Sequence, residues 1–347
     1  MKKVLLLMSG GVDSSYCAYL LQKAGYIVHG VYLKLHDKEE KHNYYVRNIE
    51  KCAEALGISY DIVDERDLFK DAVYDYFVES YKKGLTPNPC AMCNPKVKFS
   101  IAFKKADELG YDFVATGHYA QIIDSKIAQA VDIHKDQSYF LFGLKQKWID
   151  RIIFPLGDKI KENIKPIALK ELPWLGTLET YKDSQEICFV ENTYVDVLEK
   201  HFDTNNEGDV LDTKGNKIGK HKGYMQYTIG KRKGFTINGA LTPHYVLKIN
   251  PNDNTIVVGN REELAIGEVR AINVSLPLEL FKNNTKLECD VKIRYKSNKV
   301  RAEVELESNG DKEIIIARLR ENAYGVAQGQ ALVLYKENKV LGGGFIV

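Results

Sequence analysis

Two short stretches of the sequence combine side chains that do chemistry with a local structure that would expose them. The first is SGGVDSS at residues 9–15, which directly follows the apolar run VLLLM and therefore forms the turn between a strand and a helix. Such a turn aims backbone N–H groups at the helix N-terminus, where the helix dipole favours an anion. Its glycines allow a ligand to approach the backbone, and its serines add hydroxyl donors. The loop predicts a phosphate site, although a tight turn capped by Asp13 and Ser14 accounts for the same residues.

This loop lacks the lysine that many phosphate-binding loops carry. It matches neither G-x-x-x-x-G-K-[ST] nor G-x-G-x-x-G. Asp13 cannot bind a phosphate directly, but its carboxylate can hold a Mg²⁺ ion that does. We therefore expect the backbone amides and a Mg²⁺ ion on Asp13 to take the place of the missing cation.

The second stretch is TPNPCAMCNPKVKF, which places Cys90 and Cys93 just before a predicted helix. Asn94 can cap that helix, and Pro95 suits its first position. A thiol at the start of a helix is favoured as the thiolate, which is the nucleophilic form. A third cysteine, Cys188, lies far along the chain in KDSQEICFV. These cysteines predict thiol chemistry.

A bare C-x-x-C pair also occurs in zinc sites and in thioredoxin-like redox proteins. Zinc would need a second C-x-x-C or a paired histidine, and none is spaced convincingly. A thioredoxin-like pair would follow the first strand of its fold, which this pair does not. We expect the remaining cysteines, which lie in helical or strand runs, to be inert core thiols: Cys17, Cys52 and Cys289.

The elements around these residues change character along the chain. In the first half, strand-like runs alternate with helical segments, which predicts a doubly wound α/β fold whose parallel sheet binds ligands at the carboxyl ends of its strands. From about Gly208, short alternating runs between Gly, Asn and Asp turns predict a small β-rich unit and then a β-barrel. The predicted strands of the first half are 4–8, 26–35, 60–63 and 113–116, and the predicted helices lie near 14–24, 42–56, 67–82 and 96–109. The part from 120 to 200 is predicted to be mixed and mostly helical, and we expect three domains, at 1–200, 201–270 and 271–347.

Composition limits the class of protein. The chain has 347 residues, of which 44% are hydrophobic and 28% charged, as in globular proteins. Its net charge is only +2, so a surface for nucleic acid has to be local. The first apolar run is too short for the core of a signal peptide, and we expect no membrane span. Six cysteines in so long a chain make no disulfide scaffold, so we expect the cytoplasm.

One local surface of this kind is predicted at residues 213–235. That segment holds seven Lys or Arg residues and no Asp or Glu, with aromatic residues between them. This pattern suits an RNA backbone with unstacked bases beside it, but it also suits a solvated charged face.

Taken together, these segments resemble the bacterial tRNA 2-thiouridylases, a family of N-type ATP-pyrophosphatases. The resemblance covers essentially the whole chain and rests on SGGVDSS, TPNPCAMCNPKVKF, ATGHYA, KDQSYFL, DSQEICF, KHKGYMQYTIGKRKGF, IRYK and GQALVLY, in the family's order. It implies a catalytic domain like the adenine nucleotide alpha hydrolases, ATP with Mg²⁺, and adenylation of the wobble uridine followed by sulfur transfer to its C2. The implied partners are the glutamate, glutamine and lysine tRNAs and a persulfide donor protein, and the implied state is a monomer.

The resemblance also implies site residues. Cys188 matches the cysteine that carries the persulfide, and Cys93 matches its catalytic partner. His118 follows a strand and its position alone suggests a core histidine, whereas the resemblance places it near the target base. The residues implied for ATP are Leu7, Met8, Ser9, Gly10, Gly11, Val12, Asp13, Ser14, Leu33 and Gly117. Those implied for the target base or tRNA are Asn88, Pro89, Cys90, His118, Lys135, Asp136, Gln137, Arg294, Tyr295 and Gln330.

One departure from the family concerns Cys90, because many members carry Asp at this position. Cys90, Cys93 and Cys188 together could hold a 4Fe–4S cluster with one open iron that carries hydrosulfide to the base. The resemblance leaves two persulfide routes open: Cys93 attacks the Cys188 persulfide and frees hydrosulfide, or the terminal sulfur attacks C2 directly and Cys93 resolves the product. The three cysteines leave a cluster route open as well. Two other functions also remain open: a different adenylating synthetase of the same class with a small-molecule substrate, and a non-catalytic RNA-binding module.

Overall fold

The computed structural model describes residues 1–181, 187–239, 242–281, 286–310 and 312–347. Two compact units account for the chain. Unit 1 comprises 1–73, 90–185 and 338–340, and unit 2 comprises 74–89, 186–337 and 341–347. No helix within the described ranges is long and apolar enough to cross a membrane.

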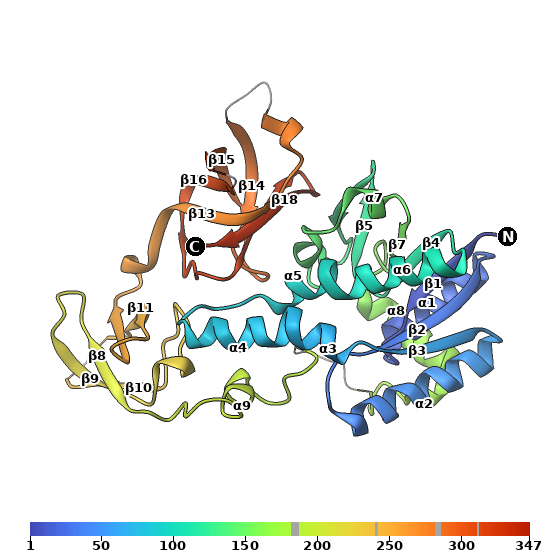
Figure 1. The fold of residues 1–347 in the computed structure, drawn as a ribbon, viewed down its shortest axis with the longest axis horizontal. Coiled ribbons are helices and arrows are strands. Elements are labelled where there is room, and N and C mark those ends of the chain that lie inside the picture. Colours follow the sequence, from blue (N-terminus) through green and yellow to red (C-terminus); the bar gives the residue numbers. More distant parts are fainter. Residues whose placement is uncertain (182–186, 240–241, 282–285, 311) are drawn as a thin grey trace. The chain divides into compact units, whose positions relative to one another are not determined.

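A five-stranded sheet in the order β3-β2-β1-β4-β7 forms the centre of unit 1 (Figure 1). All of its pairings are parallel, which confirms the predicted doubly wound fold. Residues 4–6 of β1 are fully buried, as expected for a central strand covered on both faces. The strand order changes direction between β1 and β4, and ligands bind at such a switch point. The strands are β1 (Lys3–Leu7), β2 (Ile27–Lys34), β3 (Ser59–Asp64), β4 (Phe113–Thr116) and β7 (Ile152–Ile153).

Helices cover this sheet. Buried side chains of α1, among them Cys17 and Leu21, share a core with Leu169 of α8 and with the strands. The longer helices of unit 1 are α1 (Val12–Lys23), α2 (Glu39–Leu56), α6 (Phe99–Leu109) and α8 (Lys161–Glu171). Shorter ones are α3 (Arg66–Phe69), α7 (Gln146–Ile149) and 3₁₀ turns at Ser138–Leu141 and Pro173–Leu175. A π-type turn (Lys70–Tyr74) leads from α3 into α4 (Asp75–Lys82).

The part after residue 120 is less helical than predicted. It contains a hairpin of β5 (Ala120–Ile123) and β6 (Lys126–Gln129). The turn of the hairpin uses Asp124 and Ser125, with φ of 49° and 55°. Positive φ at both central residues is the geometry of a type I′ turn, which matches the twist of the paired strands.

The helix that carries the first cysteine pair begins earlier than predicted. It runs without a break through α5 (Pro89–Cys93), a π-type turn (Asn94–Lys98) and α6. Cys90 and Cys93 therefore lie in its first turn rather than in a preceding loop. Asn94 is not the cap: its side chain donates to the Phe140 carbonyl at 3.0 Å. Proline starts the helix, but the proline is Pro89 and not Pro95.

Unit 2 contains a small β-rich part and a closed barrel. The small part is a five-stranded sheet in the order β10-β9-β8-β12-β11, with Val210, Val246 and Ile256 fully buried in its core. Its strands are β8 (Gly208–Leu211), β9 (Lys217–His221), β10 (Phe235–Ile237), β11 (Tyr245–Asn250) and β12 (Thr255–Gly259). The short helix α9 (Tyr194–Leu198), which begins with a capping box, and 3₁₀ turns at Tyr224–Gln226 and Glu262–Leu264 complete this part.

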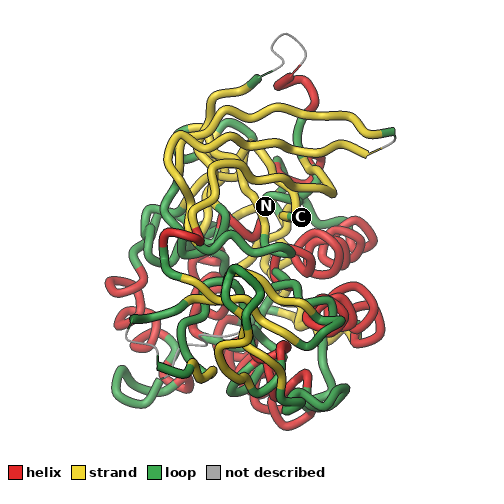
Figure 2. The backbone as a smooth tube through the Cα atoms, turned by 90° about the vertical axis from the view of Figure 1, so that its left-hand side faces the viewer, coloured by secondary structure: helices red, strands yellow, loops and turns green. Residues whose placement is uncertain are grey.

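The barrel runs β13-β16-β15-β14-β17-β18, and β18 pairs back with β13 to close it. Closure removes exposed sheet edges. Its core contains Val291, Val304 and Ile315, and β15 and β16 form its long hairpin (Figure 2). The strands are β13 (Ala265–Ser275), β14 (Leu287–Lys292), β15 (Val300–Asn309), β16 (Lys312–Tyr324), β17 (Ala331–Lys336) and β18 (Lys339–Ile346), with a 3₁₀ turn at Leu278–Phe281. The predicted succession of a small β-rich part and a β-barrel is confirmed.

Candidate functional site

The loop between β1 and α1 is an ordered turn at a helix N-terminus. Gly10 has a φ of +73°, and a Cβ there would meet the backbone oxygen of Tyr45 at 2.5 Å, so only glycine fits. From α2, the Asn48 side chain donates to the Gly10 carbonyl at 3.1 Å. Ser14 Oγ accepts a hydrogen bond from the Ser9 amide at 3.0 Å. The turn therefore presents the N-terminus of a twelve-residue helix, which favours an anion.

The other residues expected at ATP lie at the same sheet edge. Gly117 follows β4, and a Cβ there would lie 3.3 Å from the Ser14 amide nitrogen, so β4 and α1 approach closely. Leu7 and Met8 are buried at the end of β1, and Leu33 lies near the end of the adjacent β2. Because carboxyl ends of parallel strands share one edge, these residues surround a single region of unit 1.

The cation missing from the loop comes from elsewhere in unit 1. Lys161, the first residue of α8, is 5% exposed, and its Nζ lies 2.5 Å from Asp13 Oδ1. The Tyr119 hydroxyl donates to the same oxygen at 2.9 Å. The Lys161 amide donates to Asp132 Oδ2 at 2.9 Å, which fixes the start of α8. The sequence prediction missed Lys161 because 148 residues separate it from Asp13.

The sequence suggests two metal groups, a Mg²⁺ ion on Asp13 and a 4Fe–4S cluster on three cysteines. Both can be compared with this geometry. Mg²⁺ is commonly held by one or two carboxylates together with substrate phosphates. The Asp13 carboxylate is of that type, and its Oδ1 atom is already contacted by Lys161 and Tyr119. The described residues contain no group of three His, Cys, Asp or Glu side chains placed to hold a metal ion. Cys90 and Cys93 belong to unit 1 and Cys188 to unit 2, so neither unit by itself holds the three thiols of a cluster.

A tyrosine lies against the turn between β1 and α1. The Val12 amide, at the first position of α1, donates to the Tyr181 hydroxyl oxygen at 3.0 Å. The ring of Tyr181 lies under Lys165 Nζ, 5.2 Å from its centroid. An oxygen acceptor thus occupies the helix N-terminus, as a phosphate oxygen would. This residue was also missed, since 169 residues separate it from Val12.

The first cysteine pair is set one helical turn apart. Cys90 is half-buried and Cys93 is buried. Residues three apart in a helix lie on one face, so both thiols share that face of the first turn. The geometry suits nucleophilic chemistry.

The three cysteines outside the candidate site, Cys17, Cys52 and Cys289, are buried. Burial raises the pKa of Cys52 to about 11 and that of Cys289 to about 12. The pKa of Cys17 is also raised, first by burial and then by the negative charge of Asp13. These thiols stay protonated near neutral pH, as expected of inert core residues.

Cys188 lies in a tight turn of unit 2. The Val190 amide donates to the Ile187 carbonyl at 2.9 Å, so Cys188 and Phe189 are the central residues of the turn. Cys188 is exposed, whereas Phe189 is buried. The Phe189 ring packs on Phe77 of α4, with centroids 5.1 Å apart. Residues 182–186 of the same motif lie outside the described residues.

His118 is half-buried and neutral. Its Nδ1 lies 2.8 Å from the Thr116 hydroxyl, and its ring packs near Phe99 and Phe154. Burial, together with the positive charge of Lys98, lowers the pKa of His118 to about 3. A neutral imidazole can donate and accept hydrogen bonds but adds no charge at neutral pH.

The three residues of the KDQ segment differ in what they contact. Asp136 is 3% exposed, and its carboxylate accepts from Gln129, from the Ala130 amide and from Ser138. Gln137 accepts from the Tyr119 amide through Oε1. Only Lys135 is exposed. The aspartate therefore shapes the loop, and the lysine is the residue that it presents.

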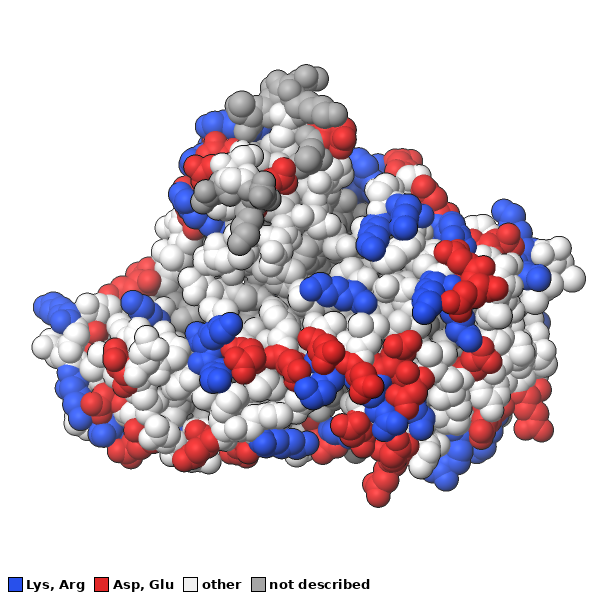
Figure 3. All heavy atoms as spheres, in the orientation of Figure 1, with Lys and Arg blue, Asp and Glu red and all other residues white. Residues whose placement is uncertain are grey.

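The basic segment 213–235 is partly neutralised within unit 2. Lys217 pairs with Asp209 at 2.8 Å, and Lys220 pairs with Asp209 at 3.1 Å and with Glu207 at 3.2 Å. Lys231 is half-buried: its Nζ donates to the Gln226 carbonyl at 2.5 Å and lies over the Tyr227 ring. Basic and acidic side chains are interspersed on the face drawn in Figure 3. The exposed basic residues that remain in the segment are Lys214, Lys222, Arg232 and Lys233.

The remaining tRNA candidates are held by contacts within unit 2. The Arg294 guanidinium donates to the Ile229 carbonyl at 2.9 Å, so it ties the barrel to the basic segment. Tyr295 is half-buried next to Arg294, with Lys292 Nζ 6.0 Å from its ring centroid. Gln330 donates to the backbone of the segment before Asn88, and Asn88 and Pro89 are buried.

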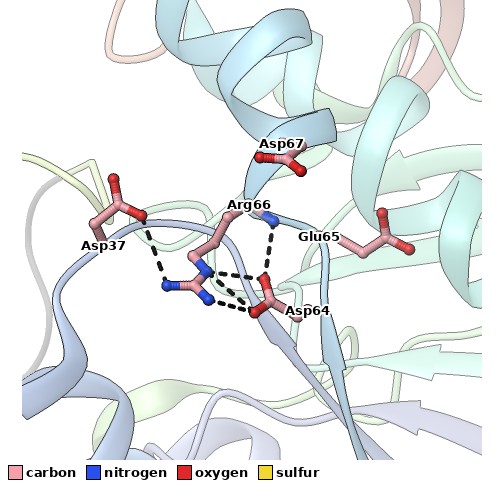
Figure 4. Close-up of a pocket in the computed structure, with 5 residues that line it drawn as sticks. All are labelled: Asp37, Asp64, Glu65, Arg66 and Asp67. Carbon is pink, nitrogen blue, oxygen red and sulfur yellow. Dashed lines mark hydrogen bonds and ion pairs between the residues drawn. The ribbon is translucent and has the colours of Figure 1, made fainter.

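A pocket of about 310 Å³ opens beyond β2 and β3, and it is lined by Asp37, Asp64, Glu65, Arg66 and Asp67. In Figure 4 the Arg66 guanidinium points between two of these carboxylates, and it pairs with Asp64 at 2.6 Å and with Asp37 at 3.8 Å. Carboxylates outnumber the single arginine here. Such a lining repels phosphates, so this pocket does not suit the phosphates of a nucleotide.

The chain matches three family models in succession. They are described as a tRNA methyl transferase HUP domain over residues 2–192, a tRNA methyl transferase PRC-barrel domain over 195–260 and an aminomethyltransferase beta-barrel domain over 266–346. Similar proteins of Helicobacter hepaticus, Nitratiruptor sp. and Helicobacter pylori all bear the name tRNA-specific 2-thiouridylase MnmA. They are 58%, 52% and 51% identical over 348, 346 and 349 residues, and each alignment covers at least 99% of both chains. The chain therefore belongs to the family of tRNA-specific 2-thiouridylases.

Proposed function

We propose that this protein uses ATP to transfer sulfur to C2 of the wobble uridine of tRNA. Family membership supports the reaction class. The observation that carries the proposal is that unit 1 holds both an anion-binding turn, with the buried Lys161 at Asp13, and two thiols in the first turn of one helix. The reaction requires an activating site and a thiol that resolves the persulfide intermediate, and Cys188 of unit 2 would carry the sulfur.

The first half-reaction is adenylation. The uridine O2 attacks the α-phosphate of ATP, the bond to the β-phosphate breaks, and pyrophosphate leaves. C2 then carries an adenylate, which is a far better leaving group than the carbonyl oxygen. The α1 amides and Lys161 would stabilise the charge that develops on the phosphates, as preorganised donors do. A Mg²⁺ ion on Asp13 would neutralise the leaving pyrophosphate.

The second half-reaction moves the sulfur. A donor protein loads Cys188, which is exposed, as a persulfide. The terminal sulfur attacks C2, the C2–O bond breaks and AMP leaves. The Cys93 thiolate then attacks Cys188, which breaks the sulfur–sulfur bond, frees 2-thiouridine and leaves a Cys93–Cys188 disulfide. A thiol reductant supplies the two electrons that reset the enzyme.

Cys90 distinguishes this route from the cluster route. If a cluster operates, loss of any of the three cysteines removes iron and activity together. If a persulfide operates, Cys93 and Cys188 are essential, whereas Cys90→Asp keeps thiolation. We expect the second outcome, measured as 2-thiouridine formed by anaerobically purified protein of known iron and sulfide content. Iron in the parent, with iron and activity both lost in Cys90→Asp, would contradict it.

The tRNA partner would be held by local basic residues. Lys135, Arg232 and Lys233 are exposed and suit phosphates. The uridine has to leave its stack to reach the ATP site, and His118 and Asn88 are our candidates for contacts to the flipped base. The glutamate, glutamine and lysine tRNAs are the substrates that we propose.

A reconstituted reaction tests the function. The protein is incubated with Mg²⁺-ATP, a tRNA transcript and a cysteine desulfurase with L-cysteine, and nucleosides and pyrophosphate are quantified. We expect 2-thiouridine and pyrophosphate in equal amounts, with pyrophosphate alone from Cys188→Ser. Pyrophosphate release that needs a small molecule and no RNA would indicate a different synthetase. RNA binding with no pyrophosphate release would indicate a non-catalytic RNA-binding protein.

A further inference from the structure

Tyr119 connects Asp13 to the loop 130–138, which contains the KDQ segment. It is 3% exposed, and its hydroxyl donates to Asp13 Oδ1 at 2.9 Å. Burial raises the pKa of Tyr119, and the negative charge of Asp13 raises it further. The phenol therefore keeps its proton and holds the carboxylate as a donor. Lys161 Nζ lies over the same ring, 5.8 Å from its centroid, so Tyr119 contacts both members of the Lys161–Asp13 pair.

The backbone of Tyr119 is paired with the end of this loop. The Gln137 amide donates to the Tyr119 carbonyl at 2.8 Å, and the Tyr119 amide donates to Gln137 Oε1 at 3.0 Å. One loop residue thus binds both the N–H and the C=O group of Tyr119. Any movement of Gln137 is therefore passed on to the tyrosine that holds Asp13.

The start of the loop holds Lys161. The buried Asp132 accepts from the Lys161 amide through Oδ2 at 2.9 Å. Its Oδ1 accepts from the His134 amide at 3.2 Å, and its carbonyl accepts from the Lys135 amide at 3.0 Å. Asp132 therefore closes the turn that presents Lys135 and also fixes the first residue of α8.

The loop is held together between these two connections. Asp136 Oδ1 accepts from the Ala130 amide and from the Ser138 amide, both at 3.1 Å. Because Asp136 is buried, these hydrogen bonds lie in a low-dielectric environment, where they are strong. Ala130 and Ser138 are the two ends of the loop. A displacement of the exposed Lys135 is therefore passed to both ends.

We infer that the loop 130–138 couples contact with tRNA at Lys135 to the charged groups of the proposed ATP site. Tyr119 and Asp132 are its positioning residues, since Tyr119 orients the Asp13 carboxylate and Asp132 places Lys161. All of these residues belong to unit 1. The inference rests on the proposed function for the identity of the two ligands. Adenylation then depends on tRNA, because the loop that contacts the tRNA also sets the geometry of the groups that act on the phosphates.

The first test is the loss of a single hydroxyl. Tyr119→Phe removes the hydrogen bond to Asp13 and keeps the ring. The matched control is Tyr60→Phe, because the Tyr60 hydroxyl donates to a different carboxylate of unit 1, that of Glu50, at 3.3 Å. At saturating ATP and tRNA, we expect pyrophosphate release to fall about tenfold in Tyr119→Phe, the effect of one lost hydrogen bond to a charged group. The affinity for tRNA should stay within about twofold of the parent.

A double-mutant cycle then tests the coupling. Each tyrosine variant is combined with Lys135→Ala, which alone should slow pyrophosphate release even at saturating tRNA. With Tyr119→Phe, the double variant should be faster than the product of the single effects by about threefold or more, because the connection is already broken. With Tyr60→Phe, the effects should multiply. Multiplicative effects in both cycles, or a parental rate of Lys135→Ala at saturating tRNA, would overturn the inference.

A second readout needs neither RNA nor turnover. Binding of Mg²⁺-pyrophosphate to the full-length protein is measured by calorimetry. We expect the affinity to fall by about threefold or more in Tyr119→Phe and in Asp132→Asn, and to be parental in Tyr60→Phe. Parental affinity in every variant would overturn the inference. If the affinities change as expected but the parent releases no pyrophosphate with tRNA, the proposed function fails while the positioning role stands. Should Asp132→Asn not fold, Tyr119→Phe carries the test.

Discussion

At the turn between β1 and α1 and in the basic segment 213–235, the charges in the folded protein differ from those that the local sequence shows. The turn lacks a cation in its own sequence, yet folding brings the buried Lys161 to it, where Lys161 is paired with Asp13. The basic segment shows seven cations, yet Lys217 and Lys220 are paired with acidic residues and Lys231 is committed to a backbone carbonyl. Charge available to a ligand is therefore a property of the folded arrangement. Counting along the chain misses the lysine that folding brings to the turn, and it overestimates the unpaired charge of the basic segment.

The largest effect is expected at Lys161. Lys161→Met keeps the length of the side chain but removes the charge at the phosphates, so tRNA-dependent pyrophosphate release should fall by about 10²–10³-fold. The matched control is Lys159→Met, because Lys159 pairs with Asp158 at 2.9 Å and not with Asp13. Pyrophosphate release is measured with saturating ATP. A Lys161→Met rate within threefold of the parent, ~0.6 kcal/mol, would show that the turn needs no cation from α8.

The next effect concerns the exposed end of the basic segment. Replacing Arg232 and Lys233 together by Ala should weaken tRNA binding and reduce the slope of log K against log salt by about 1.5, since two fewer counterions are released. The double variant of Lys217 and Lys220 should leave that slope unchanged, because their charges are already paired. Filter binding at several salt concentrations gives both slopes. Equal losses in the two variants would mean that the ion pairs open when RNA binds.

Lys231 should behave differently from its neighbours. Lys231→Met removes a hydrogen bond to Gln226 and a contact over the Tyr227 ring, so the free energy of unfolding should fall by about 1 kcal/mol. The salt dependence of tRNA binding should not change. Urea unfolding and filter binding of the same variant separate the two roles. A reduced salt slope with unchanged stability would assign Lys231 to the RNA after all.

The last prediction is a pH dependence at His118, whose protonated form is disfavoured by folding. Its pKa of about 3 in the folded protein lies below the ordinary value of 6.5, so the unfolded chain binds the proton first as the pH falls. His118 therefore contributes stability above pH 6.5 that is lost progressively between pH 6.5 and 3. In urea unfolding between pH 7.5 and 4.5, His118→Gln should lose stability less steeply than the parent. The exposed His134, replaced by Gln, serves as control, and identical slopes for all three proteins would refute the assignment.

Most of the fold could be predicted from sequence because its strands are marked by apolar runs. The buried run at β1 and the alternating runs of the barrel are of this kind. The β5–β6 hairpin was missed because its turn uses Asp124 and Ser125 where Asn-Gly is the usual signal. The start of the cysteine helix was misplaced for a related reason. Asn94 is a good cap by residue type, but its amide is used by Phe140 in the folded chain.

Less of the candidate site could be predicted, because its residues meet across long separations in sequence. The loop glycines and the cysteine pair are local patterns, and the structure places them as helix starts. Lys161 and Tyr181 contact the loop from 148 and 169 residues away, and no local pattern marks either one. Burial also changes the role of a residue. Asp136 was expected at the tRNA, but its carboxylate accepts hydrogen bonds from backbone amides within unit 1.

The π-type turn Asn94–Lys98 sets the angle at which the thiols of Cys90 and Cys93 are presented. Such a turn takes one residue more than an α-helical turn, so everything before it is rotated by about 100° around the helix axis relative to an unbroken α-helix. Residue identity decides the chemistry of the two thiols, but the number of residues in this turn decides their direction. A one-residue deletion there would leave a sound helix with both sulfurs facing another way. The number of residues in this turn therefore matters for the site as much as the presence of cysteine at positions 90 and 93 does.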